Sequence, residues 1–113
     1  MPFGPPLGTR PLGYLTDRIY TRDAWLHRVD LCRATGRPLH LTADHDGRIV
    51  ADVVTEWSGA HGQPYRLTLT GPAGGSWSRG TDGEALELDA VEFCRILSGR
   101  APGTGLLAWS VPF

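Results

Sequence analysis

Lysine and asparagine are absent from this chain of 113 residues, and only two cysteines are present. All 11 basic residues are arginine, a bias that indicates a GC-rich bacterial genome because lysine and asparagine codons are rich in A. The choice of arginine over lysine therefore carries little functional information. Cys32 and Cys94 form no C-x-x-C motif, and both lie in apolar helical surroundings. This pattern predicts reduced packing residues and argues against a cysteine zinc site.

A long apolar run and a strong net charge are also missing. The longest apolar stretch is far too short to cross a bilayer, and the N-terminus lacks the charged start and apolar centre of a signal peptide. The net charge of −1 provides no field that would attract nucleic acid or an anionic membrane. Neither a phosphate-binding loop nor a nucleophilic-serine motif occurs. The sequence therefore predicts a cytoplasmic protein whose partners include neither nucleic acid nor membrane.

Three segments have the period of a helix. Residues 15–34 place apolar side chains on several sides, which is typical of a helix surrounded by other helices, and Gly36 is expected to end this helix. Residues 41–62 carry an apolar face spaced for a second helix, with Thr42 as its N-cap. Residues 89–100 form the clearest helix, with Asp89 expected to cap it.

Other segments alternate polar and apolar residues, as strands do. The stretch "YRLTLT" (65–70) is expected to form a hairpin with "SWSRG" (76–80), and "EALELD" (84–89) and "LLAWSVPF" (106–113) are expected to be further strands. We therefore predict an α+β fold, in which an isolated N-terminal bundle-type helix precedes a small, mostly antiparallel sheet packed with two helices. Residues 1–38 would form an irregular arm and the first helix, and residues 39–113 the α+β domain.

Asp23 and His27 are the strongest candidate for chemistry. They lie at positions i and i+4 of the first expected helix, so their side chains share one face. That spacing suits two ligands of one divalent metal, with a third ligand supplied by another element. Asp30 could orient the imidazole of His27 through a hydrogen bond. The alternative for all three residues is an ordinary set of polar contacts at the surface.

Arg100 is a second candidate, because it directly follows the last helix. It could bind the carboxylate of a substrate, or it could complement the carbonyl groups at the end of that helix. His45 lies between two acidic residues, which together favour the start of a helix. His40 and His61 show no ligand spacing.

Three stretches carry a resemblance to a known family: "TRDAWLHRVDLCRATGRP" (21–38), "ADVVTEW" (51–57) and "LDAVEFCRILSGRAPGTGLL" (88–107). They resemble the C-terminal half of the mycothiol-dependent maleylpyruvate isomerase family. The resemblance implies a DinB-like, metal-binding four-helix bundle followed by a C-terminal domain similar to sterol carrier protein type 2. The family's E-x-x-x-H ligand motif falls on Asp23 and His27, with Asp in place of Glu. Zinc as the metal, and mycothiol as a thiol cosubstrate for isomerisation or transfer, are implied in the same way.

The early helices of that bundle, and the histidine that one of them carries in the family, have no counterpart in this sequence. The resemblance therefore implies a truncated member that retains the last bundle helix and the C-terminal domain. The partner of such a chain would be a small-molecule thiol or organic acid, but the chain would not be catalytically competent alone. The alternative function is a non-enzymatic binding or oligomerisation module, which would form a homo-oligomer through the exposed apolar N-terminal helix.

Overall fold

The computed structural model describes residues 19–113, which fall into two compact units. One unit runs to Arg37 and includes Phe113, and the other is Pro38–Pro112. The helices and strands are α1 (Tyr20–Thr35), α2 (Asp46–His61), β1 (Tyr65–Thr70), β2 (Gly75–Arg79), β3 (Glu84–Asp89), α3 (Ala90–Leu97) and the 3₁₀ helix η3 (Gly105–Ala108). Helices combined with a mixed three-stranded sheet confirm the α+β prediction.

Helix α1 ends as the sequence predicts. Gly36 adopts the left-handed conformation with φ of 70°, and its N–H donates to the carbonyl of Cys32. The apolar side chains of α1 do not share one environment, however. Trp25, Leu26 and Val29 are buried, whereas the large apolar side chain of Leu31 is 62% exposed. Residues 15–18 of the expected helix lie outside the described residues.

The N-cap of α2 is His45 and not Thr42, which the sequence predicted, and the side chain of His45 makes no capping hydrogen bond. Thr42 and Asp46 instead form hydrogen bonds on either side of the helix start. The hydroxyl of Thr42 accepts a hydrogen bond from the N–H of His45 at 3.2 Å, and the carboxylate of Asp46 accepts from the N–H of Thr42 at 2.6 Å. These bonds satisfy amides that would otherwise lack partners at the helix start. The predicted apolar face is buried throughout: Ile49, Val50, Val53, Val54 and Trp57.

The sheet has the strand order β2-β1-β3. Strand β2 is antiparallel to β1, with Leu67 opposite Trp77, as the hairpin prediction requires. Strand β3 lies on the other side of β1 and runs parallel to it, with Leu67 opposite Leu86. The expectation of a mostly antiparallel sheet was therefore wrong for β3, since one of the two strand pairings is parallel.

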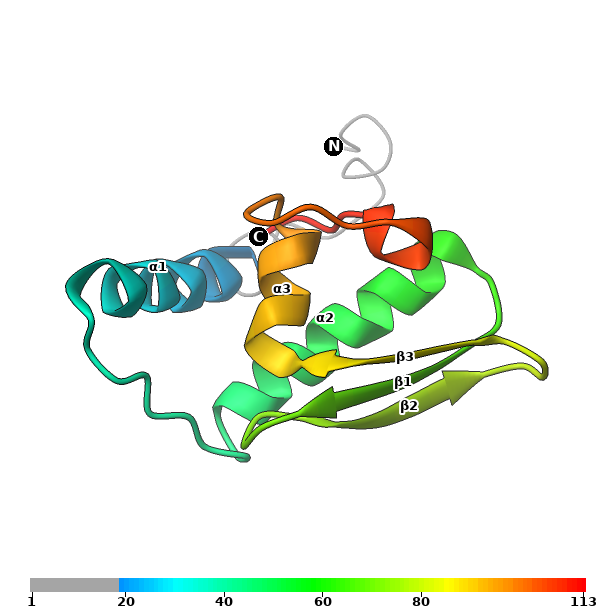
Figure 1. The fold of residues 1–113 in the computed structure, drawn as a ribbon, viewed down its shortest axis with the longest axis horizontal. Coiled ribbons are helices and arrows are strands. Elements are labelled where there is room, and N and C mark those ends of the chain that lie inside the picture. Colours follow the sequence, from blue (N-terminus) through cyan, green and yellow to red (C-terminus); the bar gives the residue numbers. More distant parts are fainter. Residues whose placement is uncertain (1–18) are drawn as a thin grey trace, which may run out of the picture. The chain divides into compact units, whose positions relative to one another are not determined.

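The short connection from β2 to β3 explains this topology. Residues 80–83 pass the start of β1 instead of turning back along β2 (Figure 1). A Cβ atom at Gly83 would collide with the backbone of Pro64 and Tyr65, so the crossing requires a residue without a side chain. The sequence "GTDG" looks like a hairpin turn. Its second glycine, Gly83, instead allows the backbone to pass close to the backbone of Pro64 and Tyr65.

Both α2 and α3 cover one face of the sheet (Figure 1). The inward side chains of β1, which are Tyr65, Leu67 and Leu69, are buried against this layer. Trp57 lies at the centre of the core, where its ring makes edge-to-face contacts with the rings of Tyr65 and Phe93 at centroid distances of 4.9 and 5.3 Å. Such pairs stabilise a core beyond simple burial of their area. The other face of the sheet is exposed.

The strand expected at residues 106–113 is not formed. The segment begins with η3, in which the N–H of Leu107 donates to the carbonyl of Thr104 at 3.0 Å. The indole N–H of Trp57 donates to the carbonyl of Leu106 at 2.9 Å, in the buried core. Trp57 therefore holds the segment around Leu106 in place, although this segment does not pair with a strand of the sheet. No helix among residues 19–113 combines the length and apolar character that crossing a membrane requires.

Candidate functional site

The predicted ligands Asp23 and His27 lie side by side on α1. The distance from Nε2 of His27 to Oδ1 of Asp23 is 3.5 Å, and their side chains are 69% and 50% exposed, respectively. One helical turn separates the two residues, so the backbone of α1 alone brings these atoms together. The structure therefore places a nitrogen donor and an oxygen donor next to each other on an open surface.

The separation of these donors suits a single metal ion. Zinc binds histidine nitrogen and carboxylate oxygen at about 2.0–2.2 Å, which places two ligands of a tetrahedral ion about 3.4 Å apart. The 3.5 Å between Nε2 and Oδ1 fits this value with little movement of either side chain. The shorter side chain of Asp23 therefore comes as close to His27 as two ligands of one ion would lie.

The two side chains of this ion pair do not by themselves make a metal site. Within residues 19–113, no group of three or more histidine, cysteine, aspartate or glutamate side chains is arranged to hold a metal ion. Asp30 lies one turn beyond His27 and is half-buried, and its predicted role in orienting the imidazole stays a prediction. A zinc site needs three protein ligands for catalysis or four for a structural role, so further donors must come from elsewhere.

Arg100 lies in the other unit, just after α3. It is half-buried, and its backbone N–H donates to the carbonyl of Arg95 at 2.8 Å. The backbone of Arg100 thus satisfies a carbonyl at the end of α3, a task that the sequence suggested for its side chain. Its predicted role as an anchor for a substrate carboxylate stays a prediction.

His61 is a feature that spacing rules did not single out. Its side chain is buried at the end of α2, where its ring meets that of Trp57 edge-on at 4.3 Å. Nδ1 accepts a hydrogen bond from the N–H of Gln63 at 2.9 Å, whereas Nε2 is buried and has no hydrogen-bond partner in the described part of the chain. Burial, and then the nearby charge of Arg79, lower the pKa of His61. Its position four residues after Trp57, on the same apolar face, was the available signal.

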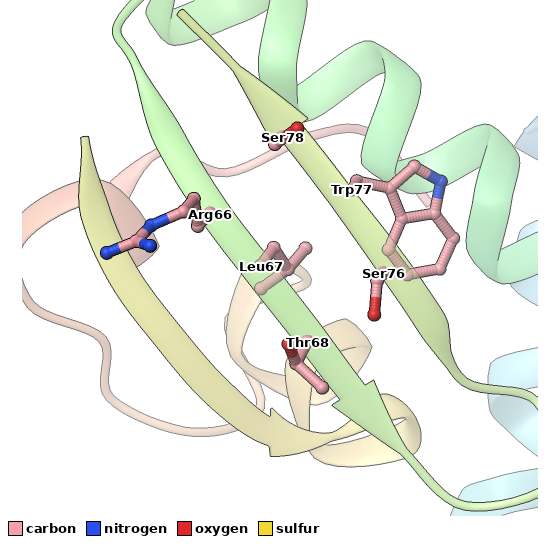
Figure 2. A pocket seen from close by; sticks show the side chains of 6 residues that line it. All are labelled: Arg66, Leu67, Thr68, Ser76, Trp77 and Ser78. Atoms are coloured by element: carbon pink, nitrogen blue, oxygen red, sulfur yellow. The ribbon is translucent and has the colours of Figure 1, made fainter. Parts of the chain in front are cut away.

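The exposed face of the sheet carries a shallow hollow of about 280 Å³ beside β1. Its polar lining comes from Arg66 and Thr68 of β1 and from Ser76 and Ser78 of β2. An arginine and hydroxyl groups could together bind an anion. Figure 2 shows the guanidinium of Arg66 directed toward β3, away from the two serines on β2. The charged group and these hydroxyls are therefore not gathered around one point.

No protein-family model, curated protein or solved structure matches this chain. Among the described residues, the most specific chemical feature is the pair of Asp23 and His27 side chains on α1.

Proposed function

We propose that α1 supplies two ligands, Asp23 and His27, to a zinc site of the kind used by mycothiol-dependent maleylpyruvate isomerases. The observation that carries this proposal is the 3.5 Å separation between the imidazole nitrogen and the carboxylate oxygen on an exposed helix face. The motif "WLHRVDL" around His27 and the segment "LSGR" before residue 101 support the link to this family.

The roles of the other residues follow from the same resemblance. Zinc, when bound, lowers the pKa of a thiol and holds it as the reactive thiolate. Asp23 and His27 would hold the ion, and Asp30 would keep the imidazole oriented. Arg100 would bind the carboxylate of an organic acid substrate through its planar guanidinium. Mycothiol would be the thiol, in an isomerisation or a group transfer.

Two ligands alone leave a zinc ion weakly held and largely open to water, so this chain would require further donors for catalysis. The proposal therefore makes metal binding, and not turnover, the property to measure first. We also expect substitution of His27 to weaken zinc binding more than substitution of any other histidine in the described residues.

Metal binding can be measured by titrating zinc, and cobalt as a coloured substitute, into purified protein. We expect His27→Ala and Asp23→Ala each to weaken zinc binding by at least about tenfold, which corresponds to about 1.4 kcal/mol. His40→Ala is the matched control, because it removes an exposed histidine outside α1. Equal zinc binding by the wild type, His27→Ala and His40→Ala would contradict the proposal.

A non-enzymatic function is the second candidate. Tyr20 and Leu31 of α1 are 71% and 62% exposed and lie on one side of the helix, and a continuous exposed apolar surface marks a binding site. In this case α1 would bind a partner or a second copy without any metal. Light scattering in the presence of a chelator tests this function, and a protein that stays monomeric at high concentration would count against it.

A further inference from the structure

The exposed face of α1 has the spacing of a helix-pairing seam. Tyr20, Ala24, His27 and Leu31 are all exposed and follow one another at intervals of four, three and four residues. At 100° per residue these positions fall within about 60° around the helix. This spacing is the heptad pattern by which two helices pack along a common seam. Asp23 lies beside the seam, next to His27.

The middle of this seam carries the two ligands of the proposed metal site, and the ends of the seam are apolar. The donors of Asp23 and His27 are 3.5 Å apart and open to solvent. Tyr20 lies toward one end and Leu31 at the other, and Ala24 contributes the smallest side chain of the stripe. A partner that completes the site must therefore bring both metal donors and apolar side chains at matching intervals. A second copy of α1 has both.

We infer that two copies of this chain pair through α1 as antiparallel helices and share one zinc ion between their Asp23–His27 pairs. This inference rests on the proposed function, because it requires that the pair binds metal. An antiparallel arrangement with a two-fold axis near the middle of the stripe sets Tyr20 against Leu31 of the second copy. It likewise sets His27 against Ala24 of the second copy, which leaves room for the imidazole.

The helix geometry brings the four donors within reach of one ion. Each His27 lies about 1.5 residues from the two-fold axis, so the two histidines are offset by about 4.5 Å along the helices. Paired helices lie about 8–10 Å apart, a distance that an imidazole and a carboxylate extending from each side can span. Two histidines and two aspartates then supply the four ligands of a tetrahedral zinc ion.

The same geometry makes the dimer dependent on metal. A contact between two stripes of four residues buries much less surface area than the roughly 1,000 Å² that a stable protein interface needs. The contact between Tyr20 and Leu31 therefore does not hold the two copies together without the ion. Conversely, one copy offers only two donors. Zinc binding and dimer formation thus strengthen each other, with a stoichiometry of one ion per two chains.

Size-exclusion chromatography with light scattering tests this inference on the full chain. We expect a mass near the 12.3 kDa of the monomer with a chelator, and about twice that mass when half an equivalent of zinc is added. The double variant Asp23→Ala/His27→Ala should stay monomeric in zinc. His40→Ala/Asp44→Ala is its matched control, because it removes the same two residue types at the same spacing outside α1.

Ala24→Arg separates pairing from metal binding. It keeps both donors but places a long, charged side chain opposite His27 of the second copy. We expect it to abolish the dimer and to weaken zinc binding at least about tenfold, with the helical circular dichroism signal unchanged. Zinc bound one-to-one by a monomeric wild type would overturn the shared site and leave the proposed function standing. No zinc binding would overturn both, and a dimer that persists with the chelator would overturn the metal bridge.

Discussion

At the scale of single residues, His61 is a buried group whose charge state bears on stability. Its neutral ring fits the core, with Nδ1 accepting from Gln63 and the ring set against Trp57. Protonation would put a charge where burial and Arg79 both oppose it, and these are the causes that lower its pKa. The unfolded chain consequently takes up the proton at a higher pH than the folded chain does.

This difference gives the sign of a pH effect. Because the unfolded state binds more protons between the ordinary histidine pKa of 6.5 and the lowered value, the free energy of unfolding falls as the pH drops through this range. His61→Asn keeps an acceptor near Gln63 but cannot take up the proton. We expect chemical denaturation at pH 7 and pH 5 to show a smaller loss of stability for His61→Asn than for the wild type. His40→Asn should behave like the wild type, and an equal loss in all three proteins would contradict this account.

At the scale of elements, α3 shows how one side chain can define a boundary. Asp89 ends β3 and caps α3 directly, because its carboxylate accepts from the N–H groups of Val91 and Glu92 at 2.9 and 3.1 Å. The arrangement joins strand and helix without a loop. The last turn of α3 is closed by backbone bonds, including one from Ser98 to the carbonyl of Cys94 at 3.0 Å.

Removing the cap should have a measurable cost. We expect Asp89→Ala to lower the free energy of unfolding by about 1 kcal/mol, as the loss of an N-cap usually does. Asp89→Asn should retain most of that stability, since asparagine caps helices equally well. Glu87→Ala, on the exposed face of the same strand, is the control and should change stability by less than about 0.5 kcal/mol. Urea denaturation gives all three values, and equal stability of Asp89→Ala and Glu87→Ala would contradict the role of the cap.

Local patterns predicted the elements better than their pairing. The alternation in "YRLTLT" and the cap at Asp89 depend on neighbouring residues, so the sequence shows them directly. The parallel pairing of β3 depends on how Gly83 passes Pro64, a contact between segments about 20 residues apart. The conformation of residues 105–108 depends on the bond from Trp57 to Leu106. Neither contact has a signature in the local sequence.

For the candidate site too, the sequence predicted what depends on local spacing and did not predict which side chains are buried. The proximity of Asp23 and His27 follows from helix geometry alone and was predicted from spacing. The sequence did not predict that Tyr20 and Leu31 are exposed while Trp25 is buried. It shows apolar residues on several sides of α1 but does not indicate which side is covered. The hidden position of His61 was missed for the same reason.

At the scale of the whole molecule, the unit Pro38–Pro112 has a core of its own. Trp57 and the rings that surround it all belong to this unit, as do both layers of the fold. A unit that closes its own core can fold without the rest of the chain.

We therefore expect residues 38–112, produced as a separate protein, to unfold cooperatively and to keep the fluorescence of a buried tryptophan. Trp57→Phe in this fragment should lower its stability by removing the bond to Leu106 and part of the core volume. Thermal unfolding followed by circular dichroism and by fluorescence provides the measurement. A fragment with a disordered spectrum would show that the rest of the chain is needed for folding.

The crossing at Gly83 also bears on the order in which this unit folds. Strands β1 and β2 pair across a short turn, with Leu67 opposite Trp77, whereas β1 and β3 pair residues almost twice as far apart in sequence. Closing the shorter loop costs less entropy, so the hairpin is the nucleus that this topology favours. Because α3 follows β3 without a loop, we expect the pairing of β3 to bring Phe93 against Trp57 in the same step. In that order of folding, the core closes when the last strand joins the sheet.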